Sequence, residues 1–293
     1  MPRPPPFAAP VAIGGLGGSG TRVFAAMLRH GGYHIGETLN APLDNLWFTV
    51  LFKRAAWART RPDPADIATS VRLFTRAMTT GLRGDLDPAE RALIAALRDD
   101  LHPNGPWRCG AQPPHADALL DSGPQPGGAG RPWGWKEPNT HVFLPHLDRL
   151  IPGLRYVHIV RDGYDMAFST NTWQARHWAH LYPVPRDPDL ALPLRQLQYW
   201  IAANRAALDY GRRHMPGRFL ALQYEDFCAR PDQHWDILRR FVGAAPDLAL
   251  PTDLVQPTTI GRSQDHDLSL FAQNLHDEVQ ALQSDVAKFQ IAG

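Results

Sequence analysis

A glycine-rich stretch near the N-terminus has the residue types of an anion-binding loop. It reads GGLGGSGTR over residues 14–22, after the apolar run VAI and before the run VFAAML. Glycines let successive backbone amides point inward, and a following helix adds the partial positive charge of its first turn. The hydroxyls and the arginine add further polar groups, so the set is suited to a phosphate–sulfate anhydride without a metal ion. The expected binding residues are Gly17, Gly18, Ser19, Gly20, Thr21 and Arg22.

Two familiar nucleotide-binding motifs match this stretch only in part. Gly15 and Gly20 have the spacing of G-x-x-x-x-G-K-[ST], but Thr21 and Arg22 stand where Lys and Ser or Thr belong. The lysine that contacts the β- and γ-phosphates is therefore missing. The glycines can also be aligned with G-x-G-x-x-G, and Glu37 lies near the distance of its acidic residue, but no second strand is predicted before it. A tight turn that binds nothing is the structural alternative.

A second candidate anion site follows the clearest strand of the sequence. Residues 154–160 read LRYVHIV, and Arg161 comes at the carboxyl end of that run. Ser169 lies eight residues later, two turns into a helix predicted over 162–172. An arginine fork with a hydroxyl can hold a phosphate monoester. The alternative is a surface ion pair between Arg161 and one of the two aspartates that follow it.

The elements that must position these residues alternate between strands and helices. Such alternation predicts an α/β fold with a central parallel sheet, helices on both faces, and ligands at the carboxyl ends of the strands. Strands are predicted at 11–15, 133–136, 154–160 and 219–223. A first helix is predicted from within the glycine loop to about residue 30. Further helices are predicted near 65–80, 88–101, 140–150, 162–172, 193–214 and 267–289, the last with an apolar stripe expected to pack on the domain.

Composition sets the limits of the functional interpretation. The 293 residues carry a net charge of +1, which gives no reason to expect nucleic acid or an anionic membrane as a partner. The N-terminal residues MPRPPPFAAP have too much proline for a signal peptide, and no apolar run is long enough to span a membrane. With two cysteines, both expected to be buried, a cytoplasmic location is the default. We expect one domain over 1–293, with a helical and loop insertion at about 37–132.

Four motifs in order give the chain a resemblance to the sulfotransferase family. They are the glycine loop with S-G-T, the strand followed by R-D-x-x-D-x-x-x-S, the segment QYEDF at 223–227, and IGR at 260–262. The resemblance implies a P-loop-NTPase-like sulfotransferase fold and 3′-phosphoadenosine 5′-phosphosulfate (PAPS) as the sulfuryl donor, with 3′-phosphoadenosine 5′-phosphate (PAP) as the product. In such a site the first loop binds the 5′-phosphosulfate, and Arg161 with Ser169 binds the 3′-phosphate. Tyr224 lies near the nucleotide, and Gly261 with Arg262 closes over its phosphate end.

The chain departs from the family pattern at the residues expected to do the chemistry. Many relatives have a lysine or arginine just before S-G-T, where this chain has Gly18. The resemblance offers Lys136, in a Lys-x-Pro motif, as the group that stabilises negative charge on the leaving oxygen, with Arg22 as the other possible source of charge. The alternative for Lys136 is a surface lysine paired with Glu137. Pro138 stands where cytosolic sulfotransferases have their catalytic histidine. The resemblance then points to a carboxylate base in the region of Glu37 and Asp44; for either residue, a helix cap or a solvated side chain is the alternative.

The resulting prediction is transfer of a sulfuryl group to a hydroxyl, with an amine as the less favoured acceptor. The acceptor is expected to be a small or sugar-like molecule bound by the segments 37–110 and 173–190. No metal is expected, because His177 and His180 form a pair without a third ligand. The first alternative is a metal-dependent kinase on a degenerate P-loop, which would need ATP and magnesium. The second is a nucleotide-binding protein without activity.

Overall fold

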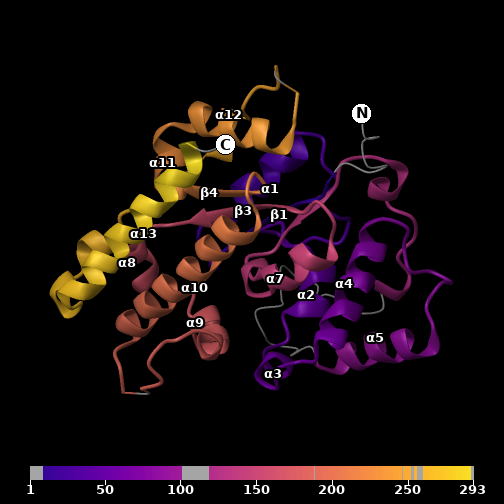
Figure 1. The fold of residues 1–293 in the computed structure, drawn as a ribbon, viewed down its shortest axis with the longest axis horizontal. Helices are drawn as coiled ribbons and strands as arrows, with labels where there is room; N and C mark the ends of the chain where they lie inside the picture. Colours follow the sequence, from indigo (N-terminus) through magenta and orange to yellow (C-terminus); the bar gives the residue numbers. More distant parts are fainter. Residues whose placement is uncertain are drawn as a thin grey trace. The chain divides into compact units, whose positions relative to one another are not determined.

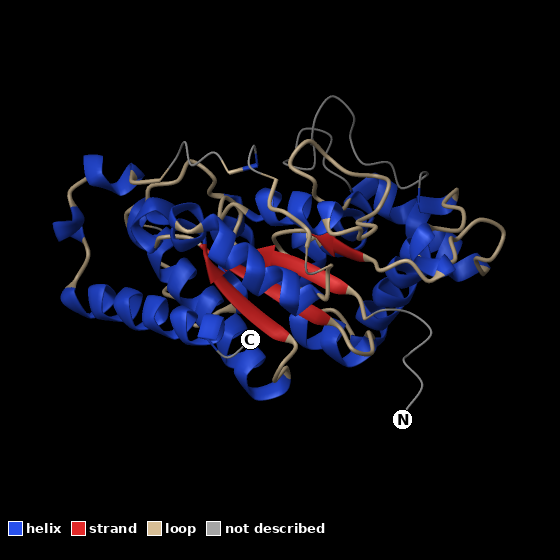
Figure 2. Ribbon diagram, turned by 90° about the horizontal axis from the view of Figure 1, so that it is seen from above, coloured by secondary structure: helices blue, strands red, loops and turns tan. Residues whose placement is uncertain are grey.

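The structure is a computed structural model with a four-stranded sheet. It describes residues 9–100, 119–187, 189–245, 247–251, 254–255 and 260–291. The strands lie in the order β2-β1-β3-β4 in a central parallel sheet with helices around it (Figure 2). This arrangement confirms the predicted fold class. The strands are β1 (Val11–Gly15), β2 (Gly134–Lys136), β3 (Arg155–Val160) and β4 (Phe219–Gln223).

The strands form where the sequence has short runs of apolar residues. Almost every strand residue is buried, as expected for parallel strands that are covered on both faces. β3 and β4 pair in register from Tyr156–Phe219 to Val160–Gln223. Both strands therefore end at the same edge of the sheet, and the next residues along the chain are Arg161 and Tyr224.

Two compact units share β1. The first comprises residues 1–12, 32–137 and 143–154, and the second comprises 13–31, 138–142 and 155–293. The first unit holds α2 (Leu46–Phe52), α3 (Ala55–Arg59), α4 (Pro64–Met78), α5 (Pro88–Asp100), η1 (Pro126–Ala129) and most of α7 (Thr140–Leu150). The second unit holds α1 (Thr21–His30), α8 (Gly163–Ala167), α9 (Trp173–Trp178), η2 (Ala179–Leu181), α10 (Leu192–His214), α11 (Tyr224–Ala229), α12 (Pro231–Val242), η4 (Arg262–Asp265), η5 (Leu268–Leu270) and α13 (Gln273–Ile291).

An aromatic core holds the first unit together. All seven residues of α2 are buried, so the helix runs through the interior of the unit. Phe48 stacks on Phe52 with the ring centres 4.4 Å apart, and Phe74 meets Trp135 edge-on at 5.0 Å. Aromatic pairs of this kind stabilise the unit beyond the contribution of the apolar area that the rings bury. These ring contacts fix α2 and α4 against β2, the strand that ends in Lys136.

In the second unit, two long helices cover the sheet. α13 packs on α10 and on β4, and Figure 1 shows α10 and α13 as the orange and yellow helices. The stripe predicted for the C-terminal segment is confirmed as packing, since Leu275, Val279, Leu282 and Val286 are buried. The helix begins at Gln273, because η5 forms a separate turn before it. No helix among the described residues has the length and apolar character needed to cross a membrane.

The helix predicted over 162–172 is wrong in its extent. α8 ends at Ala167, and α9 starts only at Trp173. The Ser169 hydroxyl accepts a hydrogen bond from the amide of Asn171 at 3.2 Å. A short polar side chain that bonds the backbone two residues on competes with the helical ladder, and this sequence has four such residues in a row over 169–172. Ser169 therefore lies in the turn after α8 and not on a second helical turn.

Candidate functional site

The glycine loop connects β1 to α1 within the second unit. Gly20, the residue before the helix, has φ 87°, in the left-handed region that favours glycine. A β-carbon at Gly20 would lie 2.3 Å from the ring of Tyr224. The loop therefore requires glycine here for two independent reasons, its backbone conformation and its contact with the tyrosine.

Several polar groups of the loop have no protein partner in the described part of the chain. The amides of Gly18, Gly20 and Thr21 meet no acceptor there, in keeping with the open donors at a helix start. Thr21 is 4 % exposed, so its hydroxyl is a nearly buried group at the first turn of α1. The Ser19 hydroxyl donates to the carbonyl of Leu16 at 2.7 Å, and its oxygen still has acceptor capacity. Arg22 is exposed.

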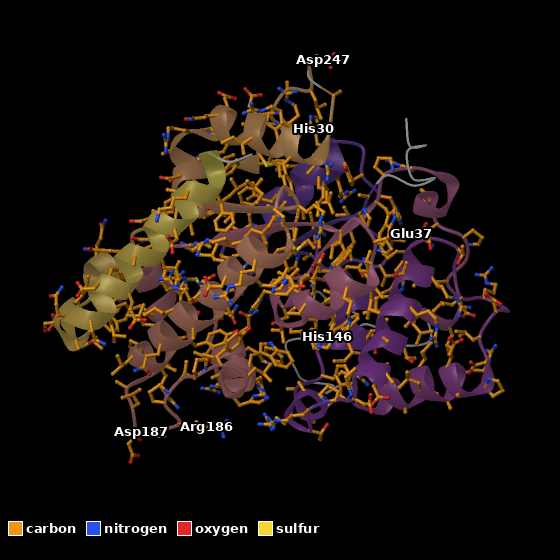
Figure 3. The ribbon with its side chains drawn as sticks, viewed as in Figure 1. His30, Glu37, His146, Arg186, Asp187 and Asp247 are labelled. Carbon is orange, nitrogen blue, oxygen red and sulfur yellow. The ribbon has the colours of Figure 1, made fainter. Side chains whose placement is uncertain are left out.

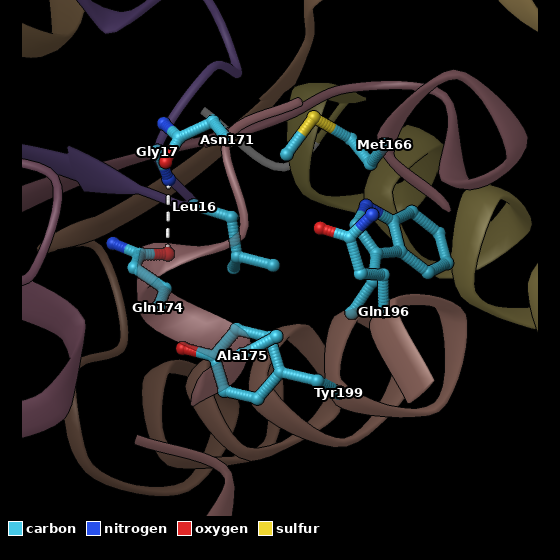
Figure 4. Close-up of a pocket in the computed structure, with 9 residues that line it drawn as sticks. Leu16, Gly17, Met166, Asn171, Gln174, Ala175, Gln196 and Tyr199 are labelled. Carbon is cyan, nitrogen blue, oxygen red and sulfur yellow. Dashed lines mark hydrogen bonds between the residues drawn. The ribbon is translucent and has the colours of Figure 1, made fainter. Parts of the chain in front are cut away.

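The amide of Gly17 is bound by a side chain that sequence reasoning missed. It donates to Oε1 of Gln174 at 2.9 Å, and both residues line a small, partly open pocket (Figure 4). Nε2 of Gln174 donates to Oδ1 of Asn139 at 2.7 Å, and the same oxygen accepts from the indole of Trp178. This relay fixes the orientation of the glutamine amide, so its oxygen faces the loop. Nothing in the spacing of these residues signals the contact.

Arg161 and Ser169 both lie against the glycine loop. Nη1 of Arg161 donates to the carbonyl of Gly18 at 3.0 Å, and the guanidinium lies 5.5 Å from the ring centre of Tyr224. A β-carbon at Gly18 would come within 4.0 Å of the Ser169 hydroxyl. Two carboxylates, those of Asp165 and Glu225, lie 3.7 and 3.8 Å from nitrogens of Arg161. Arg161 is thus a buried group within the site and not part of a surface ion pair.

The late loop docks on the helix that follows Arg161. Asp165 accepts hydrogen bonds from the amides of Gly261 and Ser263, both at 2.8 Å. Nη1 of Arg262 donates to the backbone carbonyl of Asp165 at 3.2 Å. The second unit therefore holds the glycine loop, Arg161 and the late turn in one connected set of contacts.

In the first unit, Lys136 and Asp44 form a buried ion pair. Lys136 is 1 % exposed, and its ammonium group contacts the Asp44 carboxylate. The other oxygen of Asp44 accepts a hydrogen bond from the side-chain amide of Asn40 at 2.7 Å. The backbone carbonyl of Lys136 accepts from the amide of Asn45 at 2.7 Å, which ties the start of α2 to the end of β2. The structure thus brings together two of the three residues predicted to do the chemistry.

The third residue, Glu37, lies in a different setting. Its side chain is exposed (Figure 3), and one carboxylate oxygen meets Nε2 of Gln125 at 3.5 Å. A second ion pair, Lys53 with Glu137 at 3.8 Å, lies at the other end of α2. Both ends of this helix are therefore bound by oppositely charged pairs that involve consecutive residues of the β2 segment.

Comparison with protein families decides the identity. A family model described as "Sulfotransferase family" matches residues 10–247. The chain belongs to the sulfotransferase family. No curated protein sequence matches it.

Solved structures of sulfotransferases have a similar fold at low sequence identity. The sulfotransferase domain from the curacin biosynthetic pathway is 16 % identical, with 96 % of this chain and 98 % of that one covered and a TM-score of 0.48. The sulfotransferase domain from the Synechococcus PCC 7002 olefin synthase is 17 % identical, with 97 % and 94 % covered and a TM-score of 0.44. A sulfotransferase from Alicyclobacillus acidocaldarius is 15 % identical, with 97 % and 94 % covered and a TM-score of 0.44.

Three histidines of the second unit are held by burial or by ring packing. Burial lowers the pKa of His141 to about 4, although its hydrogen bond with the Pro138 carbonyl acts in the opposite direction. Burial lowers the pKa of His158 to about 3, and its ring bonds Asn204 and Tyr156. His177 packs against Trp173 at 4.5 Å. Among the described residues, no three His, Cys, Asp or Glu side chains are grouped to hold a metal ion.

Proposed function

We propose that this sulfotransferase moves a sulfuryl group from PAPS to a hydroxyl of a small or sugar-like acceptor. In that reaction the acceptor oxygen forms a bond to sulfur, the bond from sulfur to the bridging phosphate oxygen breaks, and PAP leaves. The acceptor proton goes to a base. The observation that carries the proposal is that Arg161 and Ser169 meet the glycine loop at Gly18. A bisphosphorylated nucleotide needs two anion sites on one framework, and the candidates for both lie in the second unit.

The glycine loop supplies donors suited to the 5′-phosphosulfate. The open amides of Gly18, Gly20 and Thr21 lie at the first turn of α1, where the helix favours negative charge. The nearly buried hydroxyl of Thr21 adds another donor. These groups are fixed before the reaction, so they stabilise charge on the leaving phosphate without reorganisation. The exposed Arg22 is the remaining cation of the predicted set.

Arg161 and Ser169 are suited to the 3′-phosphate, with Tyr224, Gly261 and Arg262 around them. A guanidinium offers several donors in one plane, which matches the oxygens of a phosphate. Charge-assisted hydrogen bonds of this kind are worth about 1.5–3 kcal/mol each. The 3′-phosphate is therefore expected to be a main source of donor affinity.

For the chemical step we propose Lys136 and Asp44. The ammonium of Lys136 would stabilise negative charge on the bridging oxygen, and Asp44 would take the acceptor proton late in the reaction. Asp44 is preferred to Glu37 because it is the carboxylate that contacts Lys136, whereas Glu37 is exposed and bonds only a glutamine among the described residues. The segment at about 37–132, within one domain, would shape the acceptor site, and no metal is required. We propose a cytoplasmic location for the protein.

Nucleotide binding tests the proposal directly. PAP at 100 times its dissociation constant should raise the melting temperature by about 5 °C, since this occupancy adds about 2.7 kcal/mol. Adenosine 5′-monophosphate (AMP) and ATP with magnesium should act more weakly. Arg161→Ala should reduce the affinity for PAP by about 10- to 100-fold and leave the affinity for AMP nearly unchanged. A response to ATP with magnesium alone would support a kinase, and transfer of labelled sulfate from PAPS across an acceptor panel would identify the acceptor.

A further inference from the structure

One buried carboxylate holds the late turn of the second unit in place. Asp165 is 1 % exposed, and its two oxygens accept from the amides of Gly261 and Ser263, each at 2.8 Å. A charged acceptor that receives two amide hydrogen bonds away from water makes strong bonds. The turn therefore depends on a residue almost a hundred positions earlier in the chain.

Two further contacts reinforce this docking. Arg262 donates to the backbone carbonyl of Asp165 at 3.2 Å. The ring of His266 stacks on Phe168, with centres 3.9 Å apart and an interplanar angle of 9°. Because α8 carries both Asp165 and the Phe168 cap, the whole turn lies along that one short helix.

The same carboxylate also faces Arg161. Oδ2 of Asp165 lies 3.7 Å from Nη2 of Arg161, and Nη1 of that arginine donates to the carbonyl of Gly18 at 3.0 Å. Asp165 thus stands between two arginines from distant segments, Arg161 after β3 and Arg262 in the late turn. Asp165 is therefore placed to orient both arginine side chains toward one bound anion.

We propose that Asp165 is a positioning residue for recognition of the 3′-phosphate, acting by docking the turn that carries Arg262. This inference rests on the proposed function, since it assumes that the 3′-phosphate binds between these arginines. Asp165 itself does not bind the nucleotide. Without its carboxylate the turn is released, and Arg262 no longer contributes to binding.

A double-mutant cycle on PAP affinity tests this role. Removing a negative charge near a phosphate also changes affinity directly, but that effect is the same with and without Arg262 and cancels in the cycle. Arg262→Gln is expected to weaken PAP binding about tenfold in the parent, the loss of one charge-assisted contact. In the Asp165→Asn background the same change should cost less than about twofold. AMP, which lacks the 3′-phosphate, should show no such coupling.

Asp162→Asn is the matched control. It makes the same chemical change three residues away, where the carboxylate caps α8 by accepting from Tyr164 and Asp165 amides and does not touch the turn. In that background the tenfold effect of Arg262→Gln should persist. Hydrogen exchange of peptides spanning 260–266 gives a readout without nucleotide, and it should accelerate in Asp165→Asn but not in Asp162→Asn.

The outcomes separate the two proposals. A parent protein that binds PAP no better than AMP would contradict the proposed function itself. If the parent prefers PAP, additive effects of Asp165→Asn and Arg262→Gln would overturn the positioning role. Unchanged exchange of the 260–266 peptides in Asp165→Asn would also overturn it. Coupling together with faster exchange would establish it.

Discussion

The two compact units hold their polar groups in different ways. In the second unit, the anion-binding candidates are mostly backbone amides and arginines fixed by backbone carbonyls, as between Arg161 and Gly18. In the first unit, the candidates for chemistry are side chains held by each other, as Lys136 is by Asp44. Backbone donors are suited to tight binding of the nucleotide, because their positions are fixed. Paired side chains are suited to the chemical step, in which a proton is transferred or a charge develops. The contrast predicts that substitutions in the second unit mainly weaken nucleotide binding and that substitutions in the first unit mainly lower turnover.

The change that should separate these effects most strongly is Lys136→Met. Methionine keeps much of the apolar stem but removes the charge, so the leaving oxygen loses its counter-charge. We expect kcat to fall by about 10³-fold, with the dissociation constant of PAP within about threefold of the parent value. Single-turnover sulfate transfer and PAP calorimetry measure the two quantities.

Lys53→Met is the control for Lys136→Met. It breaks the ion pair with Glu137 at the other end of α2, so it tests loss of helix anchoring without loss of the proposed charge. Turnover should stay within about tenfold of the parent. An equal loss in both variants would show that anchoring of α2, and not chemistry at Lys136, explains the effect.

A comparison of two carboxylates sharpens the assignment within the first unit. Asp44→Asn should lower kcat by about 10²-fold because the proposed base is lost. Glu37→Gln should lower it less than about threefold, since Glu37 is exposed and forms no ion pair with Lys136 among the described residues. Steady-state rates across pH 6–9 measure both. The reverse order of effects would make Glu37 the base.

A comparison of Gly20 with Gly32 tests the rigidity of the glycine loop. Gly20→Ala should destabilise the protein by about 2 kcal/mol more than Gly32→Ala, from urea unfolding. The two positions have nearly the same φ, 87° and 86°, but a β-carbon at Gly32 meets nothing within 4 Å, whereas at Gly20 it meets Tyr224. Equal losses would mean that the tyrosine moves aside easily and that the loop is less fixed than its contacts indicate.

A last prediction concerns the pH dependence of stability. His141 and His158 have folded pKa values of about 4 and about 3, below the ordinary 6.5. Between these pKa values and pH 6.5, the unfolded chain binds more protons than the folded chain does. The free energy of unfolding is therefore highest above pH 6.5 and decreases as the pH falls from 6.5 toward the folded pKa values. His158→Gln should reduce that slope by about 1.4 kcal/mol per pH unit between pH 6 and 4, measured by urea unfolding.

The sequence predicts the framework better than the site. β1, β3 and β4 are mostly apolar runs, and α10 has clear ends, so their predicted bounds lie within one residue of the structure. Lys136 and Asp44 were both selected, but spacing gives no way to pair residues 92 positions apart. The Gln174 and Asp165 contacts depend on how turns fold back on the sheet edge, which no local pattern encodes. Ser169 and Arg161 both lie near Gly18, although Ser169 is in the turn after α8 and not on the longer helix that was predicted.

The turn before α2 has a consequence for the rate of the proposed reaction. A lysine that is 1 % exposed reaches a substrate only after its surroundings open, and Asp44 belongs to a turn closed by Asn40. Leu43, within this turn, has φ 64°, a conformation that costs a non-glycine residue roughly 1–2 kcal/mol. If the backbone of Leu43 relaxes when the turn opens, the released strain would offset part of the free energy of opening. In the proposed reaction the turn would open before Lys136 meets a substrate, so turnover would be no faster than that opening.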